Sequence, residues 1–388
     1  MAVVGQGYVG LPLALAAAES GFEVVGIDID TEKVNSLNAG KSPVGDITDG
    51  FLSAHLGSYH ATNEFSEASG AEIVILCLPT PLDELRNPDH SFVMEGANAV
   101  APYLSEQALV INESTVAPGF TRENLAPIFK KNDVAYSPER IDPGNQTWNI
   151  KNTPKLVSGL SEVASSRAVD FYSSFISSVT SYSSVEVVET AKLLENSFRL
   201  VNISLINEIA QFCDAMGVNI QEVISAAATK PYGYMPFYPS AGAGGHCIPV
   251  DPNFLTLKAR EMGTPTRLIE LANELNMERP SYFVGVAKKI LGSLSGKRII
   301  VIGIAYKPNV ADTRDTPADK LISLLRNMGA VVVWHDPIVK NWRGEVSVTL
   351  DSKFDLAILL NPHSLFNLQS IEAAAIINVR GGDDNDDL

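Results

Sequence analysis

The hydrophobic positions in the first part of the chain form short runs that are separated by helical stretches. A run AVVG opens the chain, an alanine-rich helical stretch reaches Ser20, Gly21 ends it, and a second run EVVGIDID follows. Further runs lie at 72–78, at 108–111 and around 134–136. Short continuous apolar runs are typical of strands that are covered on both faces. The pattern predicts a doubly wound parallel sheet, in which loops at the carboxyl ends of the strands build the site.

The hydrophobic period becomes helical at about Val185 and stays helical until Gly217. Glycine is a common helix stop, so the pattern predicts a single long helix. Such a helix would connect two domains. Its apolar positions, at helical spacing, are Leu194, Phe198, Val201, Leu205, Ile209 and Phe212.

A second α/β pattern begins at Gly296 with the run KRIIVIGI, followed by a loop, a helix from about Pro317 and the run AVVVWHDP. In each α/β region the second strand ends at an aspartate, Asp28 in the first region and Asp336 in the second. The second region lacks the full glycine motif. We therefore expect an α/β protein with two Rossmann-like, doubly wound parallel-sheet domains, joined by the long central helix and a helical middle domain. The expected domains are residues 1–184, 185–292 and 293–388.

Composition and charge narrow the class of protein. The 388 residues are 45% hydrophobic and 19% charged, as in ordinary globular proteins, and a net charge of −16 argues against nucleic-acid binding. The longest apolar runs, of about ten residues, are too short to span a bilayer, and we expect a cytoplasmic protein without a leader. Three widely spaced cysteines fit neither a disulfide framework nor a metal site, so we expect free thiols and no metal.

The opening glycines match a dinucleotide-binding loop. Gly5, Gly7 and Gly10 form GxGxxG directly between a strand and a helix, with Asp28 at the end of the next strand. Gly5 allows the tight turn, Gly7 lets a pyrophosphate approach the helix N-terminus, and Gly10 permits close packing. Asp28 would bind the ribose hydroxyls and repel a 2′-phosphate, and no arginine follows it. The loop therefore favours NAD over NADP, with a chance turn as the weaker interpretation.

The segment GAGGHCIPVDP, residues 242–252, contains the thiol of Cys247. Glycines free the backbone before the thiol, and Asp251 with Pro252 resembles the cap and first residue of a helix after it. A thiol just before a helix N-terminus gains thiolate character, because the helix dipole lowers its pKa. A buried small residue for Cys247 and a simple cap for Asp251 remain open alternatives.

Seven ordered motifs carry a resemblance that extends over almost the whole chain. They are GQGYVGLPLA, LPTPLD, ESTVAPG, SPERIDPG, ETAKLLENSFR, GAGGHCIPVDP and GIAYKPNVADTRDTP. In this order they resemble the UDP-glucose/GDP-mannose dehydrogenase family. The stretch ATKPYGYMPFYPSAGAGGHCIPVDP looks most like the UDP-N-acetylglucosamine 6-dehydrogenase branch, with UDP-N-acetylmannosamine and UDP-glucose enzymes as neighbours. Ser240 and Ala243 depart from the family's GPGLGGHC-like loop, so the motif does not determine which sugar the chain binds.

The resemblance implies a four-electron oxidation of a UDP-sugar alcohol to an acid, in polysaccharide biosynthesis, with two NAD consumed in sequence. Cys247 would attack the intermediate aldehyde, and a second hydride transfer would leave a thioester for water to hydrolyse. Lys192 and Asn196 lie four residues apart, so they share one helix face and can both point at the reacting oxygen. An exposed pair on a solvated stripe is the alternative.

The resemblance also assigns the remaining site residues. Asp251 and Thr115 resemble the residues that hold the catalytic water, and Glu139 resembles the general base or acid of thioester hydrolysis. Lys307 would meet the substrate pyrophosphate, and the guanidinium of Arg314 suits a phosphate or carboxylate. The expected NAD contacts are Gly5, Gly7, Tyr8, Val9, Gly10, Asp28, Lys33, Pro79, Thr80, Thr115 and Arg314. The expected substrate contacts are Glu139, Arg140, Lys192, Asn196, Tyr238, Gly244, Lys307 and Arg380.

Two other functions remain as alternatives. A two-electron dehydrogenase of the β-hydroxy-acid type also joins a Rossmann domain to a helical domain, but it has no use for a cysteine among glycines. A catalytically silent NAD-binding protein would not need Cys247, Lys192, Asn196, Glu139 and Asp251 together. As partners we expect a UDP-sugar and further copies of the chain, in a homodimer or higher assembly, with neither nucleic acid nor membrane.

Overall fold

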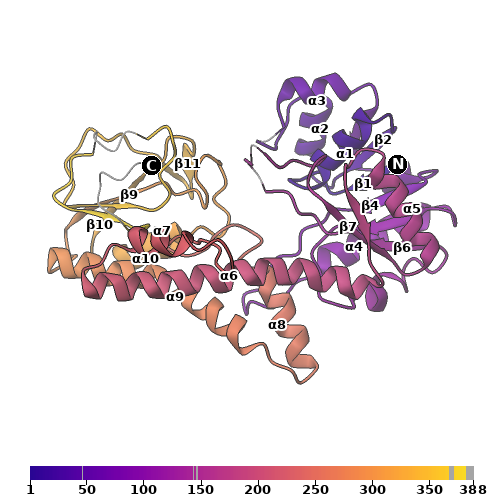
Figure 1. The fold of residues 1–388 in the computed structure, drawn as a ribbon. Coiled ribbons are helices and arrows are strands. Elements are labelled where there is room, and N and C mark those ends of the chain that lie inside the picture. Colours follow the sequence, from indigo (N-terminus) through magenta and orange to yellow (C-terminus); the bar gives the residue numbers. More distant parts are fainter. Residues whose placement is uncertain (46, 143, 146, 367–370, 382–388) are drawn as a thin grey trace. The chain divides into compact units, whose positions relative to one another are not determined.

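The computed structural model describes residues 1–45, 47–142, 144–145, 147–366 and 371–381 (Figure 1). The chain forms two compact units. Unit 1 contains Met1–Glu195 and Asn253–Gly263, and unit 2 contains Asn196–Pro252 and Thr264–Leu388. The division falls within two helices, α6 (Val185–Met216) and α8 (Asp251–Glu261).

Unit 1 is built on a sheet that has eight strands within the described residues, in the order β3-β2-β1-β4-β5-β6-β7-β8. The neighbouring strands are parallel, as predicted, except that β7 runs antiparallel to β6. The strands are β1 (Ala2–Val4), β2 (Val24–Ile27), β3 (Tyr59–Thr62), β4 (Ile73–Leu76), β5 (Leu109–Asn112), β6 (Asp133–Tyr136), β7 (Lys155–Gly159) and β8 (Val179–Ser181).

Both faces of this sheet are covered, which explains the continuous apolar runs of its strands. Side chains alternate along β1, so that Val3 packs in one core cluster while Ala2 and Val4 pack in another. The helices of unit 1 besides α6 and α8 are α1 (Gly10–Glu19), α2 (Thr31–Asn38), α3 (Asp49–His55), α4 (Ser91–Val100) and α5 (Glu162–Ser173), with single turns at Phe65–Ala68, Ala101–Tyr103 and Thr121–Leu125.

Unit 2 contains a smaller parallel sheet, in the order β10-β9-β13-β14. The predicted second α/β pattern is confirmed, since KRIIVIGI forms β9 and AVVVWHDP forms β10. The strands are β9 (Arg298–Ile302), β10 (Val331–His335), β13 (Leu356–Leu359) and β14 (Ile376–Asn378), beside a hairpin of β11 (Asn341–Trp342) and β12 (Glu345–Val346). The helices are α7 (Ile220–Ala228), α9 (Arg267–Leu291) and α10 (Pro317–Asn327).

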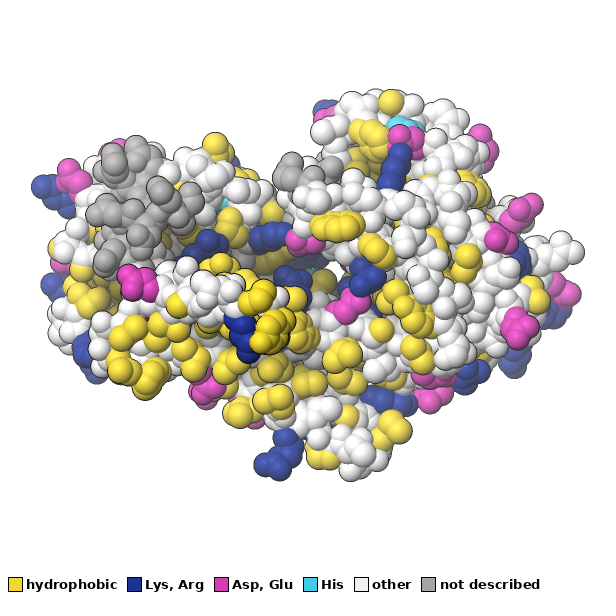
Figure 2. Space-filling view, viewed as in Figure 1, with side chains coloured by type: hydrophobic (Ala, Val, Ile, Leu, Met, Phe, Trp, Pro, Cys, Tyr) yellow, Lys and Arg dark blue, Asp and Glu magenta, His cyan; other side chains and the backbone are white. Residues whose placement is uncertain are grey.

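Helix α6 begins at Val185 and ends just before Gly217, as the hydrophobic period predicts. Its polar residues Lys192 and Asn196 are buried, with 6% and 5% of their surface exposed. Its apolar positions Leu205 and Phe212 are instead 54% and 60% exposed. Figure 2 shows hydrophobic side chains gathered over the second half of this helix. Among the described residues, no helix is long and apolar enough to cross a bilayer.

Candidate active site

Predicted cofactor residues of unit 1, together with Glu139, follow the strands of its sheet at one edge, whereas the predicted NAD contact Arg314 belongs to unit 2. The parallel strands β1, β4, β5 and β6 are neighbours, so the loops after their carboxyl ends share this edge. The glycine loop follows β1, Thr80 follows β4, Thr115 follows β5 and Glu139 follows β6. Thr80 is buried and Pro79 before it is exposed. The sheet therefore collects residues that are far apart in the sequence.

The glycine loop leaves open space at one position and is tightly packed at two. Gly5 has a φ of 93°, and a Cβ there would lie 2.3 Å from the carbonyl oxygen of Cys77. A Cβ at Gly10 would lie 1.8 Å from the carbonyl oxygen of Gly5. A Cβ at Gly7 would meet nothing within 4 Å. This open space next to the N-terminus of α1 fits a pyrophosphate that approaches the backbone.

Asp28 lies at the end of β2, beside the glycine loop. Its carboxylate accepts hydrogen bonds from the backbone N–H of Gln6 at 2.8 Å and of Asp30 at 3.0 Å. It also forms an ion pair of 2.8 Å with Lys33, another predicted cofactor residue. These bonds hold the carboxylate in place at the position where the predicted motif requires a ribose acceptor.

Gln6 and Tyr59 support this loop, and the sequence analysis missed both. The buried side chain of Gln6 donates to the carbonyl oxygen of Val3 at 2.8 Å. The hydroxyl of Tyr59 donates to Gln6 Oε1 at 2.9 Å, and burial raises the pKa of Tyr59. Gln6 occupies an unspecified position of the motif and Tyr59 lies 53 residues away, so the sequence carries no local signal for the pair.

Lys192 and Glu139 come together within unit 1. The Lys192 Nζ donates to the backbone carbonyl of Glu139 at 2.6 Å. Arg140, the next residue, pairs with Glu195 at 2.7 Å and donates to the carbonyl oxygen of Pro154 at 2.7 Å. The burial of Lys192 excludes the alternative of an exposed lysine on a solvated stripe.

Glu189 fixes the start of α6 to the loop after β5. Its fully buried carboxylate accepts hydrogen bonds from the backbone N–H of Gly119 at 2.6 Å and of Thr121 at 3.0 Å. Burial raises the pKa of Glu189, against the opposing effect of these hydrogen bonds. The sequence analysis did not identify this residue, because Gly119 lies 70 positions away from it in the chain.

In unit 2, the cysteine loop meets a buried amide and carboxylate pair. The Asn196 Nδ2 donates to Asp251 Oδ2 at 2.6 Å, and Asp251 is 1% exposed. The backbone N–H of Asp251 donates to the carbonyl oxygen of Cys247 at 2.9 Å. Asp251 is the first residue of α8 rather than its cap, so the helix begins one residue earlier than we expected. The half-buried Cys247 thus leads directly into a helix N-terminus.

The glycines of this loop pack against the loop that follows β9. A Cβ at Gly244 would lie 2.9 Å from Tyr306 Cβ, and a Cβ at Gly245 would lie 2.8 Å from the Tyr306 ring. The N–H of Gly245 donates to the carbonyl oxygen of Arg314 at 3.0 Å. Larger residues at Gly244 and Gly245 would separate the two loops.

Three polar residues hold the preceding part of the cysteine loop, and the sequence analysis missed all three. Asn276 accepts from the N–H of Ala243 at 2.6 Å. Asn207 accepts from the N–H of Ser240 at 2.9 Å, and the Arg279 Nε donates to the carbonyl oxygen of Ser240 at 3.0 Å. Burial lowers the pKa of Arg279 to about 10.

The predicted substrate contacts Lys307, Arg380 and Tyr238, and the predicted NAD contact Arg314, lie on separate segments of unit 2. Lys307 is half-buried in the loop after β9, and Arg314 is 44% exposed and pairs with Asp312 at 2.6 Å. Arg380 is half-buried after β14, where burial lowers its pKa. Tyr238 is 55% exposed, in the segment before the cysteine loop. Their roles remain predictions.

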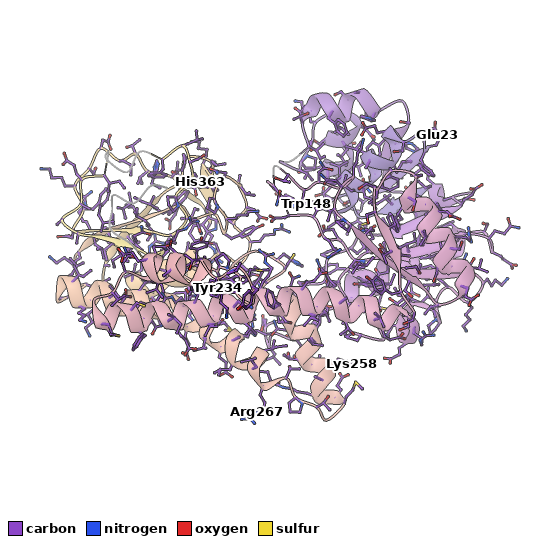
Figure 3. The ribbon with its side chains drawn as sticks, viewed as in Figure 1. Glu23, Trp148, Tyr234, Lys258, Arg267 and His363 are labelled. Carbon is purple, nitrogen blue, oxygen red and sulfur yellow. The ribbon has the colours of Figure 1, made fainter. Side chains whose placement is uncertain are left out.

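Asp336 has a different role from that of Asp28, although both close the second strand of an α/β pattern. Its buried carboxylate accepts from the backbone N–H groups of Ile304, Ala305, Ile338 and Val339. It also accepts from His363 Nε2 at 3.0 Å, and Figure 3 labels His363 within unit 2. Burial would raise the pKa of Asp336, but these hydrogen bonds outweigh it and hold the pKa below its ordinary value. The carboxylate is therefore fully used inside the fold.

Three parts of the chain match one family. Its NAD binding domain matches residues 1–176, its central domain matches residues 186–278 and its UDP binding domain matches residues 300–380. The chain belongs to the UDP-glucose/GDP-mannose dehydrogenase family. Membership makes it an NAD-dependent nucleotide-sugar dehydrogenase. Within the part of the chain that the structure describes, no group of three or more His, Cys, Asp or Glu side chains is placed to hold a metal ion.

Individual relatives agree with this family. A UDP-N-acetyl-D-mannosamine dehydrogenase of Methanococcus maripaludis is 33% identical, over 94% of this chain and 86% of the relative. A UDP-N-acetyl-D-glucosamine 6-dehydrogenase of Pseudomonas aeruginosa is also 33% identical, over 87% of this chain and 83% of the relative. The solved structure of a UDP-D-ManNAc dehydrogenase from Pyrococcus horikoshii is similar with a TM-score of 0.90 and 32% identity, covering 98% of this chain and 95% of that one.

Proposed function

We propose that this chain oxidises the C6 primary alcohol of a UDP-N-acetylhexosamine to the carboxylate, through a thiohemiacetal and a thioester on Cys247. The observation that carries the proposal is the buried Asn196–Asp251 pair, whose Asp251 N–H also binds the Cys247 carbonyl. This arrangement connects the residue that carries the thiol to a helix N-terminus whose first residue is a buried carboxylate bonded to an amide. A two-electron dehydrogenase needs no such thiol.

Each proposed step uses residues of the chain. The glycine loop would hold NAD, which would supply the hydride acceptor for C6 in each of the two oxidations, with the hydroxyl proton lost to water. The thiol of Cys247 adds to the aldehyde carbon, and loss of the second hydride converts the thiohemiacetal to a thioester. Lys192 and Asn196 stabilise the negative charge on the reacting oxygen. Water, held by Asp251 and Thr115 and deprotonated by Glu139, then releases the acid and restores the thiol.

The sugar epimer has two candidates. The stretch TKPYGYMPFYP favours UDP-N-acetylglucosamine by its likeness to that branch. The names of relatives that cover 94% of the chain favour UDP-N-acetylmannosamine, which we rank first. Both candidates carry the N-acetyl group, so we expect either one to be oxidised faster than UDP-glucose.

We further propose three parts, residues 1–184, 185–292 and 293–388, for NAD binding, for the cysteine loop and for UDP-sugar binding. Lys307 and Arg380 would contact the substrate in the third part. The exposed apolar stripe of α6 supports association of the chain into a homodimer or a higher assembly. The need for a reduced Cys247 is consistent with a cytoplasmic location.

The test counts NADH formed per sugar with UDP-N-acetylmannosamine, UDP-N-acetylglucosamine and UDP-glucose. We expect two NADH per sugar, and no acid from the Cys247→Ala variant, because the thioester cannot form. Cys213→Ala serves as the control, since Cys213 is a buried thiol of the core. One NADH per sugar, or acid formation by Cys247→Ala at the wild-type rate, would make the two-electron dehydrogenase the better account.

A further inference from the structure

A buried charged network lies behind the predicted site of unit 1, and the proposed mechanism does not use it. The Lys155 Nζ forms an ion pair of 2.9 Å with Glu113 Oε2. The hydroxyl of Tyr172 donates to the other carboxylate oxygen, Glu113 Oε1. The Lys155 Nζ also lies 5.0 Å from the centre of the Tyr172 ring. Glu113, Lys155 and Tyr172 are 3%, 8% and 0% exposed.

Burial of these charges needs an explanation. An ion pair that is removed from water is seldom worth more to stability than apolar residues of the same volume. A surface ion pair would serve equally well to connect β7 with the loop after β5. The network is therefore a candidate for a role in function.

A small cavity connects this network to Glu139. The cavity has a volume of about 20 Å³, and its polar lining includes Glu113, Lys155, Glu139, Arg140 and Thr153. This volume suits about one water molecule, which requires two to four polar partners. An ammonium group has three donors, so Lys155 can bind Glu113 and a water at the same time.

We propose that Lys155, held by Glu113 and Tyr172, is a positioning residue that orients the carboxylate of Glu139 through one bound water and keeps it ionised. This inference rests on the proposed role of Glu139 as the base of thioester hydrolysis. Lys155 itself touches neither the sugar nor the cofactor in this scheme. It acts through the water on Glu139.

Two other cations near Glu139, Arg140 and Lys192, have hydrogen-bond partners of their own. The guanidinium nitrogens of Arg140 donate to Glu195 and to the carbonyl oxygen of Pro154. Lys192 donates to the backbone carbonyl of Glu139. Burial raises the pKa values of the Cys77 thiol and the Tyr172 phenol, so both stay neutral. Of the two cations that line the cavity with Glu139, Lys155 is the one whose ion-pair partner, Glu113, lines the cavity as well.

The experiment measures the decay of the covalent sugar adduct on Cys247 by intact mass, in single turnovers between about pH 5 and 9. We expect Lys155→Met to move the acid limb of the hydrolysis profile upward by about 1 pH unit, so that hydrolysis on that limb is about tenfold slower. Lys151→Met is the matched control, because Lys151 forms an exposed ion pair with Glu19. An unchanged limb in Lys155→Met would overturn the inference.

Two further variants distinguish a wrong role for Lys155 from a misfolded variant and from a wrong role for Glu139. Lys155→Met leaves Glu113 buried without its cation, so the double variant with Glu113→Gln repeats the test in a neutral network if the single variant does not fold. Glu139→Gln tests the base itself, and adduct decay at the wild-type rate in that variant refutes the proposed role of Glu139. A crystal structure should show one ordered water between Lys155 and Glu139, and a direct contact or a dry cavity there would exclude the water bridge.

Discussion

The glycines of the opening loop differ in what surrounds them, although the motif treats them alike. Gly10 packs against the backbone of Gly5, while the space beside Gly7 is open. The sequence predicts all three positions and the acid that follows them. It does not predict the supports Gln6 and Tyr59, because their contact depends on the pairing of β2 with β3 rather than on any local pattern.

Alanine at Gly10 and at Gly7 should have different effects. The Gly10→Ala methyl group would overlap the carbonyl oxygen of Gly5, so we expect a loss of roughly 1–3 kcal/mol in the free energy of unfolding. Gly7→Ala should unfold like the wild type, but its methyl group would occupy the space for the pyrophosphate and weaken NAD binding. Denaturant titration and NAD titration measure the two effects. Equal loss of stability in both variants would contradict the assignment of Gly10 to packing and of Gly7 to the pyrophosphate space.

Asp28 should determine the choice of cofactor. We expect a preference for NAD over NADP of at least tenfold in kcat/KM, about 1.4 kcal/mol, because a carboxylate repels the 2′-phosphate. Asp28→Asn should reduce this preference. Asp30→Asn is the control, since Asp30 caps α2 and should affect stability alone. Equal use of the two cofactors by the wild type would refute the role of Asp28.

At the scale of elements, α6 shows what periodicity can and cannot predict. The spacing of apolar residues predicts the bounds of the helix, but not which face the fold covers. The covered face carries Glu189, Lys192 and Asn196, and the apolar positions Leu205 and Phe212 stay exposed. The partners of the buried polar residues come from distant loops, so no spacing within the helix could have identified them.

Two glutamates of α6 should give opposite pH dependences of stability. Burial raises the pKa of Glu189, so the folded state binds the proton more tightly, and stability falls as pH rises above the ordinary value of 4.5. The hydrogen bond from Arg122 lowers the pKa of Glu186 to about 2, so stability rises with pH between about 2 and 4.5. Denaturant unfolding of Glu189→Gln and Glu186→Gln against the wild type should show the two slopes. Slopes of one sign would contradict this account.

At the scale of the whole molecule, the sequence predicts two α/β regions and a long helix, and the structure confirms them. The direction of β7 was not predicted, since it runs antiparallel to β6 in a sheet that the pattern predicts to be parallel. The site residues of unit 1 could be placed at one sheet edge from the order of the strands alone. The network of Glu113, Lys155 and Tyr172 could not, because it joins three elements across the core.

Association of the chain should depend on the exposed stripe of α6. We expect the wild type to have a molar mass in solution that is a multiple of the chain mass. Leu205→Glu combined with Phe212→Glu should reduce it to a monomer, because charges cannot be buried in an apolar contact. Light scattering measures the mass, and Leu85→Glu is the control at another exposed leucine. An unchanged mass in the double variant would exclude this face.

The fully occupied carboxylate of Asp336 bears on the timing of the reaction. Since this carboxylate accepts hydrogen bonds from backbone amides and His363, it is not available to a ribose, and in the proposed four-electron reaction the glycine loop of unit 1 would serve both oxidations. Under that proposal, the half-oxidised sugar would remain bound while NADH leaves and NAD binds. A high ratio of NADH to NAD around the protein would therefore slow the reaction between the two oxidations as well as after the second one.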